Sequence, residues 1–243
     1  MNYLLTLKYD GSRYHGWQRQ DNAITVQECV ENAVYKLFGE NASVTGCSRT
    51  DTGVHANCFK CNFRTEKLLP HSSVISGMNH FLPDDIAVVS SEEAADDFNA
   101  RFNCKSKEYI YVIYNGALRD PFYNNRAFHY KFPLDEKMLD KEAKDYIGTH
   151  DFSAFRAAGA TTKTTERTVI SAGVERYGDL VIFRVEADGF LYNMVRIMVG
   201  TLININEGKI EKGAIPEIIS SKDRQKAGKT QVPDGLYLNK VQY

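Results

Sequence analysis

The sequence carries almost no excess charge and no long apolar run. Its 243 residues hold 30 Lys and Arg against 31 Asp and Glu, a formal net charge of −1. A chain without a global basic signature can bind nucleic acid only through a local basic face. It contains no run of about 18 apolar residues, so we expect no membrane-spanning helix. Its first residues lack the basic and apolar regions of a signal peptide, and we expect none.

The sequence contains only five cysteines, an odd number. This does not fit a disulfide framework and favours a reducing compartment, so we expect a cytoplasmic protein. Cys58 and Cys61 form a C-x-x-C pair. Positions three apart on a β-strand point to opposite faces, however, and a zinc site needs a further ligand at suitable spacing, which the sequence lacks. We therefore expect no metal site.

Several common catalytic motifs are absent. The sequence has no G-x-x-x-x-G-K-[ST], no G-x-G-x-x-G after a strand, no H-E-x-x-H and no G-x-S-x-G. These absences weigh against nucleotide hydrolysis, dinucleotide redox chemistry and the usual hydrolase mechanisms. A lone reactive Asp accompanied by Arg and Tyr indicates covalent or proton-transfer chemistry that uses no cofactor.

The densest group of reactive side chains lies in residues 46–56, which read GCSRTDTGVHA. Strand-like residues stand on both sides, so Asp51 and Gly53 are predicted to form a turn in which the glycine adopts a positive φ. With Arg49 two residues away, Asp51 can stay ionised and be held in place. The alternative is an ordinary hairpin turn in which Asp51 caps its own backbone.

The order of predicted elements repeats along the chain. The first half predicts strands at 2–9, 42–45, 54–63 and 86–90 and helices at 25–38 and 72–81. The second half predicts strands at 107–114, 169–177, 180–187 and 236–243 and helices at 135–147 and 191–205. Both halves read β-α-β-β-α-β, which predicts an α+β protein of two ferredoxin-like halves. We expect residues 1–104, which carry the Asp51 loop, and 105–243 to form one catalytic unit, a mainly antiparallel sheet with helices on one face.

The helix predicted at 191–205 is apolar nearly all round and should be buried. Its exceptions, Asn193, Arg196, Gly200 and Asn204, recur at spacings of three and four and share one face. A buried arginine needs an anionic partner, because an unpaired buried charge costs several kcal/mol. Asp51 is a candidate partner, and a structural ion pair with another carboxylate is the alternative.

Tyrosines mark the strand at 107–114. Alternation places Tyr109, Tyr111 and Ile113 on one face. A tyrosine beside a carboxylate can stack on a base or donate a hydrogen bond, although strand tyrosines usually only pack in the sheet.

Basic side chains concentrate in loops, interleaved with aromatic residues. Together they could form an RNA-binding face, although each cluster alone is more typical of solvated surface. The stretch 220–230, SSKDRQKAGKT, is predicted to be polar and flexible. The basic residues are Arg13, Arg19, Lys105, Lys107, Arg119, Arg126, Arg156, Lys163, Arg167, Lys222, Arg224, Lys226 and Lys229.

Six segments in order resemble the tRNA pseudouridine synthase A family over essentially the full length. The loop GCSRTDTGVHA is similar to its G-x-x-R-T-D-x-G-V-H segment. The others are YDGSRYHGWQRQ, FNARFNCKSKEYIYVIYN, THDFSAFRAAG, DGFLYNMVRIMVGTL and VPDGLYLNKVQY. Thr52 stands where Ala is common, and Cys58-Phe59 replace a frequent Gly-Gln.

The resemblance implies the pseudouridine synthase fold and isomerisation of uridine to pseudouridine at positions 38 to 40 of the tRNA anticodon arm. It implies no cofactor, and a homodimer that binds tRNA across two subunits. Asp51 falls on the essential aspartate, a nucleophile or base at the sugar. Tyr109 falls on a tyrosine near the target uracil, Arg49 on an arginine associated with base extrusion, and Arg196 on the arginine that pairs with the aspartate.

Two other functions fit the same residues less well. A non-catalytic RNA-binding or folding module would bind tRNA without forming product. An N-glycosidase would use a carboxylate at the sugar but release free uracil.

Overall fold

The computed structural model describes residues 1–159, 162 and 164–243, so Lys163 of the basic set lies outside the described residues. The chain folds into two compact units. Unit 1 comprises residues 1–105 and 237–243, and unit 2 comprises residues 106–236. No helix within the described ranges is long and apolar enough to cross a membrane.

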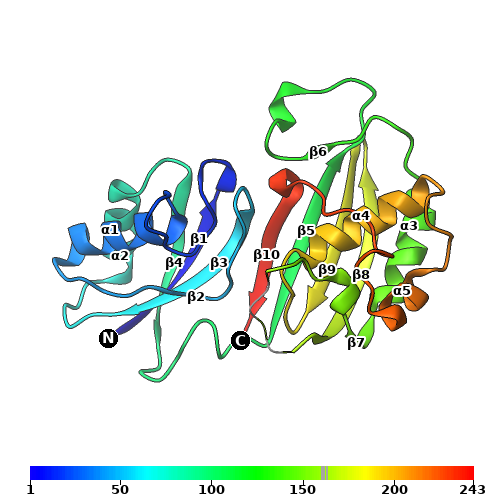
Figure 1. The fold of residues 1–243 in the computed structure, drawn as a ribbon. Coiled ribbons are helices and arrows are strands. Elements are labelled where there is room, and N and C mark those ends of the chain that lie inside the picture. The colour runs from blue at the N-terminus through cyan, green and yellow to red at the C-terminus, as the bar shows by residue number, and fades with distance from the viewer. Residues whose placement is uncertain (160–161, 163) are drawn as a thin grey trace. The chain divides into compact units, whose positions relative to one another are not determined.

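Unit 1 is built on a sheet with strand order β4-β1-β3-β10, and β2 pairs with β3. The central strand β1 is antiparallel to both neighbours, whereas β10 runs parallel to β3. Both helices lie on the same side of these strands (Figure 1). The elements are β1 (Asn2–Tyr9), α1 (Val26–Phe38), β2 (Thr45–Gly46), β3 (His55–Arg64), α2 (His71–Phe81), β4 (Ile86–Ala94) and β10 (Leu236–Gln242).

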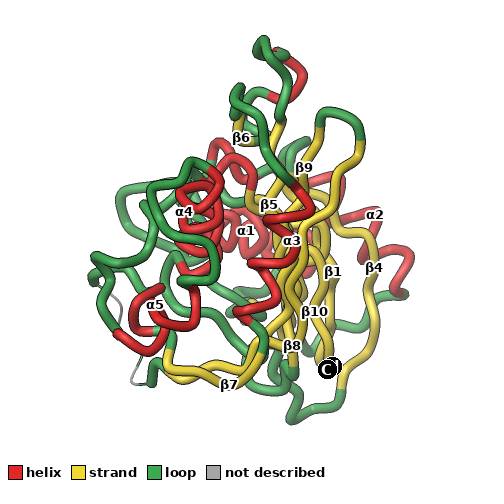
Figure 2. Tube along the Cα trace, turned by 90° about the vertical axis from the view of Figure 1, so that its right-hand side faces the viewer, coloured by secondary structure: helices red, strands yellow, loops and turns green. Residues whose placement is uncertain are grey.

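Unit 2 has the strand order β5-β9-β8-β7, antiparallel throughout, with the short β6 running parallel to β5. Its helices lie on one side of the sheet, as Figure 2 shows with α4 and α5 to the left of β8 and β9. The elements are β5 (Ser106–Tyr114), β6 (Phe128–His129), α3 (Glu136–Ala143), β7 (Gly148–Asp151), β8 (Glu166–Tyr177), β9 (Leu180–Ala187), α4 (Met194–Asn206) and α5 (Ile215–Ser221).

The α+β class with mainly antiparallel strands is confirmed. Helices α1 and α3 each begin after a capping side chain, because Thr25 accepts a hydrogen bond from the Glu28 amide and Asp135 accepts one from the Met138 amide. The final strand pairs with β3 and so lies in unit 1, whereas the sequence prediction placed all of 105–243 in the second half. Element order does not reveal which sheet edge a terminal strand joins.

Two helices are shorter than predicted, and three short strands or α-helices were missed. Helix α4 begins at Met194 because Asn193 takes a left-handed φ of 60°. Helix α3 ends at Ala143 and continues as a 3₁₀ turn. The sequence prediction contains no counterpart of β6, β7 or α5, since elements of two, four and seven residues give little periodicity to detect.

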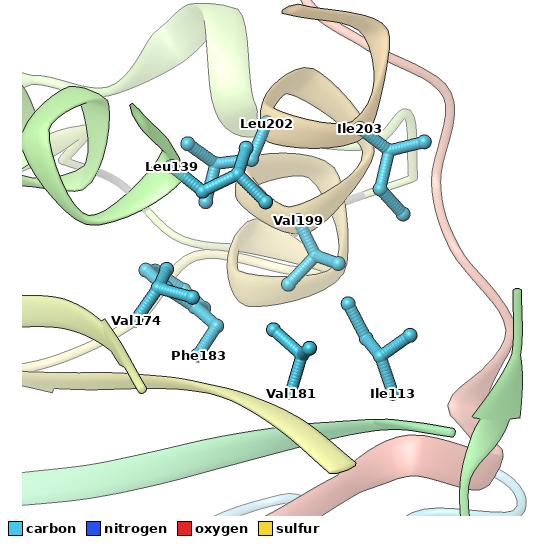
Figure 3. Close-up of a pocket in the computed structure, with 8 residues that line it drawn as sticks. All are labelled: Ile113, Leu139, Val174, Val181, Phe183, Val199, Leu202 and Ile203. Atoms are coloured by element: carbon cyan, nitrogen blue, oxygen red, sulfur yellow. The ribbon is translucent and has the colours of Figure 1, made fainter. Parts of the chain in front are cut away.

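The core of unit 2 lies between α4 and the sheet. In Figure 3, Ile113 and Val181 point from the strands toward Val199 of α4, and a small gap between them is lined by apolar side chains alone. The full lining set is Ile113, Leu139, Val174, Val181, Phe183, Val199, Leu202 and Ile203. This gap is therefore part of the packing that holds α4 on the sheet, and it offers no polar group to a substrate.

Truncation of Phe183 tests this packing. The side chain is 1% exposed, and Phe183→Ala should lower the free energy of unfolding of unit 2 by about 3–5 kcal/mol, because a large buried ring leaves a cavity. Tyr177→Ala, at the end of neighbouring β8 and 58% exposed, should change it by less than about 0.5 kcal/mol. Hydrogen exchange of the β9 amides measures both. Equal effects would contradict the assignment of Phe183 to the core.

Candidate active site

Asp51 lies on the turn between β2 and β3, as predicted. The turn is closed by the Val54 amide, which donates to the Asp51 carbonyl oxygen at 3.1 Å. Gly53 has the positive φ that the sequence predicted, 79°. The Asp51 side chain is half-buried, and Arg49, two residues earlier, is exposed. The turn therefore presents a carboxylate and a cation from a defined backbone.

A second segment, residues 9–17, holds this turn from outside it, and we call it the clasp. The Trp17 amide donates to the Thr50 carbonyl oxygen at 3.1 Å, and the Gly53 amide donates to the Tyr14 carbonyl oxygen at 3.2 Å. The Tyr9 and Thr50 hydroxyls are hydrogen-bonded at 2.8 Å in a buried position. Asp51 is thus bracketed on both sides by bonds from residues about forty positions earlier.

Two glycines make this close approach possible. A Cβ on Gly11 would overlap the Val54 carbonyl oxygen, and a Cβ on Gly16 would overlap the Thr50 carbonyl oxygen. Gly16 also has a φ of 81°, which L-residues with a Cβ rarely adopt. The glycines of YDGSRYHGWQRQ are therefore required by contact with the Asp51 turn.

An aromatic layer lies beneath the turn. Trp17 stacks on Phe59 at a centroid distance of 4.1 Å, and Tyr9 packs against the same ring at 5.6 Å. A Cβ on Gly46 would lie 2.6 Å from the Trp17 ring, so this position also needs glycine. Phe59, one of the departures from the family pattern, fills the base of the clasp, whereas Thr52 is exposed.

His55 links the turn to the start of β3. Its ring is 2% exposed, and its Nδ1 accepts a hydrogen bond from the Gly11 amide at 3.1 Å. Asp10 Oδ1 lies 3.2 Å from the same nitrogen. The ring also stacks on Tyr237 at 4.6 Å. His55 therefore fixes the clasp to the sheet of unit 1.

In unit 2, Arg196 is held in a fixed orientation on α4. Its Nε donates to the Gln231 carbonyl oxygen at 2.6 Å, and its Nη1 donates to Asn193 Oδ1 at 2.7 Å. Two contacts therefore orient the guanidinium, one from its own helix and one from the segment before β10.

The segment before β10, which carries Gln231, packs closely on α4 at Gly200, the glycine of the predicted polar stripe. A Cβ on Gly200 would overlap the Lys229 carbonyl oxygen, and the Gly228 amide donates to Thr201 Oγ1 at 2.9 Å. Ala227 and Gly228 are buried. The prediction that 220–230 is flexible is therefore wrong for residues 227–228, which pack on α4. Composition alone does not reveal that Gly228 lies against Gly200.

Tyr109 and Tyr111 lie on one face of β5, as alternation predicted, and both are buried. Tyr109 meets the edge of Phe190 at 5.0 Å. The Tyr111 hydroxyl donates to the Val232 carbonyl oxygen at 2.8 Å, and burial raises the pKa of Tyr111 despite the nearby charge of Arg196. Tyr111 therefore supports, through Val232, the segment that orients Arg196.

The structure thus groups the predicted residues in two sets. Asp51 and Arg49 share the turn in unit 1, and Tyr109 and Arg196 belong to unit 2. Sequence analysis missed three residues that contact them or their turn: Tyr9, Trp17 and Gln231, the last through its backbone carbonyl oxygen. Tyr9 and Trp17 stand in a segment that the sequence analysis had singled out.

The described part of the chain holds no group of three His, Cys, Asp or Glu side chains that could bind a metal ion. Within the C-x-x-C pair, Cys58 is partly exposed and Cys61 is buried, and burial raises the pKa of the Cys61 thiol.

Comparison with known proteins identifies the family. A family model described as tRNA pseudouridine synthase matches residues 6–103 and 143–243. The chain belongs to the tRNA pseudouridine synthase family. Both matched segments carry site residues, the first with the clasp and the Asp51 turn and the second with α4. Tyr109 lies in the unmatched interval.

Full-length relatives cover that interval. The chain is 46% identical over 242 residues to tRNA pseudouridine synthase A of Thermoanaerobacter sp. strain X514, with 100% of this chain and 99% of the relative covered. It is 45% identical to tRNA pseudouridine synthase A of Acetivibrio thermocellus and 42% identical to tRNA pseudouridine synthase A 2 of Clostridium perfringens, at the same coverage.

Among solved structures, a chain from the crystal structure of a Cbf5-Nop10-Gar1 complex aligns with a TM-score of 0.37 at 9% identity. The alignment covers 97% of this chain and 57% of that one. A likeness of this strength adds nothing to the family assignment.

Gly16→Ala tests the clasp. The added methyl group collides with the Thr50 carbonyl and displaces the Asp51 turn, so pseudouridine formation at saturating tRNA should fall by about 100-fold or more. Gly39→Ala is the matched control, since Gly39 also has a positive φ, 75°, but has open space around its Cβ position. Tritium release from tRNA labelled at C5 of uridine reports the rate. Similar losses in both variants would show that backbone strain, not contact with the turn, is responsible.

Asn193→Gly tests the orientation of Arg196. Glycine keeps the left-handed backbone but removes the acceptor at 2.7 Å from Nη1. Losing one charge-assisted hydrogen bond should slow turnover about 5- to 30-fold. Lys222→Gly replaces another left-handed residue, one that contacts Asp151 rather than Arg196, and should leave turnover within about twofold. An unchanged rate in Asn193→Gly would mean that Asn193 does not orient the guanidinium.

Proposed function

We propose that this chain isomerises uridine to pseudouridine at positions 38 to 40 of the tRNA anticodon stem-loop, with Asp51 acting at the sugar. Conversion of uridine to pseudouridine in tRNA, an isomerase activity, follows from membership in the family. The observation that carries the assignment of Asp51 is the clasp, which fixes the backbone on both sides of this one carboxylate.

The reaction changes the uracil atom that is bonded to C1′ of the ribose. The N1–C1′ glycosidic bond breaks, the uracil turns, and a C5–C1′ bond forms. The proton at C5 is lost to solvent and N1 gains one, so uridine and pseudouridine are isomers and no electrons enter or leave. The chemistry requires a carboxylate that stays ionised and oriented.

Asp51 serves as nucleophile at the sugar or as base on it, and both roles need the ionised form. Arg196 is proposed to pair with it, because a cation beside a carboxylate favours the charged state. Arg196 donates hydrogen bonds to the Gln231 carbonyl oxygen and to Asn193 Oδ1, and these two bonds limit the positions that the guanidinium can take. This restriction supports the proposed pairing.

The other two residues act on the base. A nucleotide in a stem must be extruded before its sugar can be reached, at a cost of a few kcal/mol. Arg49, exposed on the same turn as Asp51, is proposed to fill the vacated space. Tyr109 is proposed to lie against the target uracil, and its buried ring against Phe190 supports a fixed position.

We also propose a cytoplasmic homodimer in which tRNA contacts both subunits. The resemblance to the family supports dimerisation. All five cysteines are free thiols, which supports a reducing compartment.

Replacing Asp51 by Asn tests the assignment. The variant keeps size and hydrogen-bonding capacity but removes the charge, so tritium release should disappear while tRNA binding changes little. Chromatography of the wild-type product should show pseudouridine and no free uracil. Retained turnover in Asp51→Asn would remove Asp51 from the mechanism, and free uracil would point to an N-glycosidase.

A further inference from the structure

Between β5 and α3 the chain makes a long excursion, residues 115–134, which we call the arm. It projects past the ends of the unit 2 strands in both views (Figures 1 and 2). It also lies in the interval that the family model leaves unmatched.

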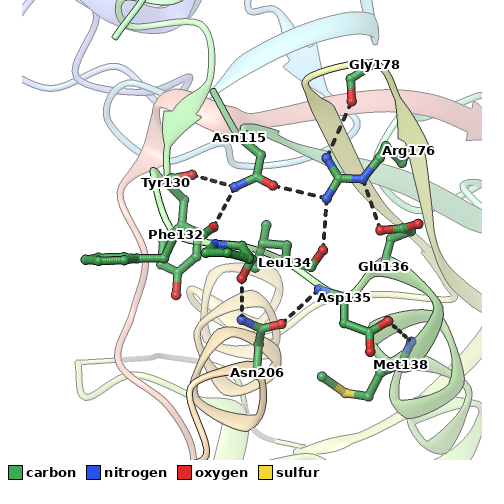
Figure 4. Close-up of polar contacts among 11 residues, drawn as sticks. Asn115, Tyr130, Phe132, Leu134, Asp135, Glu136, Met138, Arg176, Gly178 and Asn206 are labelled. Carbon is green, nitrogen blue, oxygen red and sulfur yellow. Dashed lines mark hydrogen bonds and ion pairs between the residues drawn. The ribbon is translucent and has the colours of Figure 1, made fainter. Parts of the chain in front are cut away.

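The two ends of the arm are tied together by one arginine. Asn115 Nδ2 donates to the carbonyl oxygens of Tyr130 at 2.6 Å and Phe132 at 2.8 Å. Arg176 Nη2 donates to Asn115 Oδ1 and to the Leu134 carbonyl oxygen, both at 3.0 Å (Figure 4). These contacts fix the base of the arm to β8.

The arm is also ordered along its length. Tyr123 stacks on Tyr114 at 4.8 Å, and His129 Nε2 lies 3.0 Å from the Gly116 carbonyl oxygen. Asp120 accepts a hydrogen bond from the Phe122 amide, which caps a 3₁₀ turn. The arm is thus a preformed projection, and a partner would not have to pay much ordering entropy to bind it.

The tip exposes apolar side chains beside cations. Leu118 is 81% exposed and Phe122 is 84% exposed, and neither contributes to the core. Arg119 and Arg126 are exposed as well. Lys131 lies over the Phe132 ring at 5.3 Å. Against three Lys and Arg, residues 115–134 contain a single carboxylate, Asp120, in a chain whose net charge is −1.

We propose, resting on the proposed function, that the arm binds tRNA away from the reacting nucleotide. Phe122 stacks on an unpaired base, Leu118 packs beside it, and Arg119 and Arg126 contact phosphates. An exposed aromatic among cations is a recurrent way to bind RNA bases that are not paired. The local excess of positive charge complements a phosphate backbone and favours RNA over a second copy of this nearly neutral chain.

The apolar tip is tested with Leu118→Ala/Phe122→Ala. Stacking on a base is lost, so the Kd for full-length tRNA should rise about 10-fold, while the rate at saturating tRNA stays within about twofold. The matched control, Leu68→Ala/Tyr177→Ala, removes exposed side chains elsewhere, 67% and 58% exposed, and should leave the Kd unchanged.

The cations are tested by salt dependence. Arg119→Ala/Arg126→Ala removes two phosphate contacts, so the slope of log Kd against log salt should fall by about 1.5. Lys137→Ala/Lys141→Ala, two exposed cations on α3, should leave the slope unchanged.

Three outcomes decide the proposal. A raised Kd for the tip variant with a reduced slope for the arginine variant supports it. An unchanged Kd and slope overturn it. If sedimentation shows that the tip variant has lost a dimer, the arm is a subunit interface and the proposal is overturned. Binding is read independently of product, so absence of pseudouridine from the wild-type reaction would count against the proposed function alone.

Discussion

The close backbone contact between the clasp and the Asp51 turn is the constraint on which the rest depends. Three hydrogen bonds from residues 9–17 reach the turn, and the contact exists only because Gly11 and Gly16 have no Cβ. Phe59 and Trp17 fill the space beneath it. Such rigidity suits the proposed role of Asp51 at the sugar, because an oriented group avoids reorganisation during the reaction.

In unit 2, Arg196 is likewise held by contacts that fix its orientation. Arg196 is oriented by Asn193 and by the Gln231 carbonyl, and that carbonyl is positioned by the contact between Gly200 and Lys229. In both units, glycine lets backbone segments approach closely beside the side chain that is proposed to act, at Gly11 and Gly16 in unit 1 and at Gly200 in unit 2. This suits a reaction in which the base must leave, turn and return.

The sequence predicts the element order, the Asp51 turn, the positive φ of Gly53 and the polar stripe of α4, because each depends on local pattern. It does not predict that Phe59 forms the floor of the clasp, that residues 227–229 pack on Gly200, or that the last strand pairs with β3. Those features depend on contacts between distant residues, and no periodicity encodes them. Phe59, where the chain departs from the family pattern, is the ring on which Trp17 stacks.

We propose that Arg196 pairs with Asp51 during the reaction, and this pairing is the claim to test. A double-mutant cycle on single-turnover pseudouridine formation, with Asp51→Glu, Arg196→Gln and the double variant, tests it most directly. If the two residues act together, the double variant should be about as slow as the slower single variant, since each change already disables the pair. If the two losses multiply, each residue works independently and the account is contradicted.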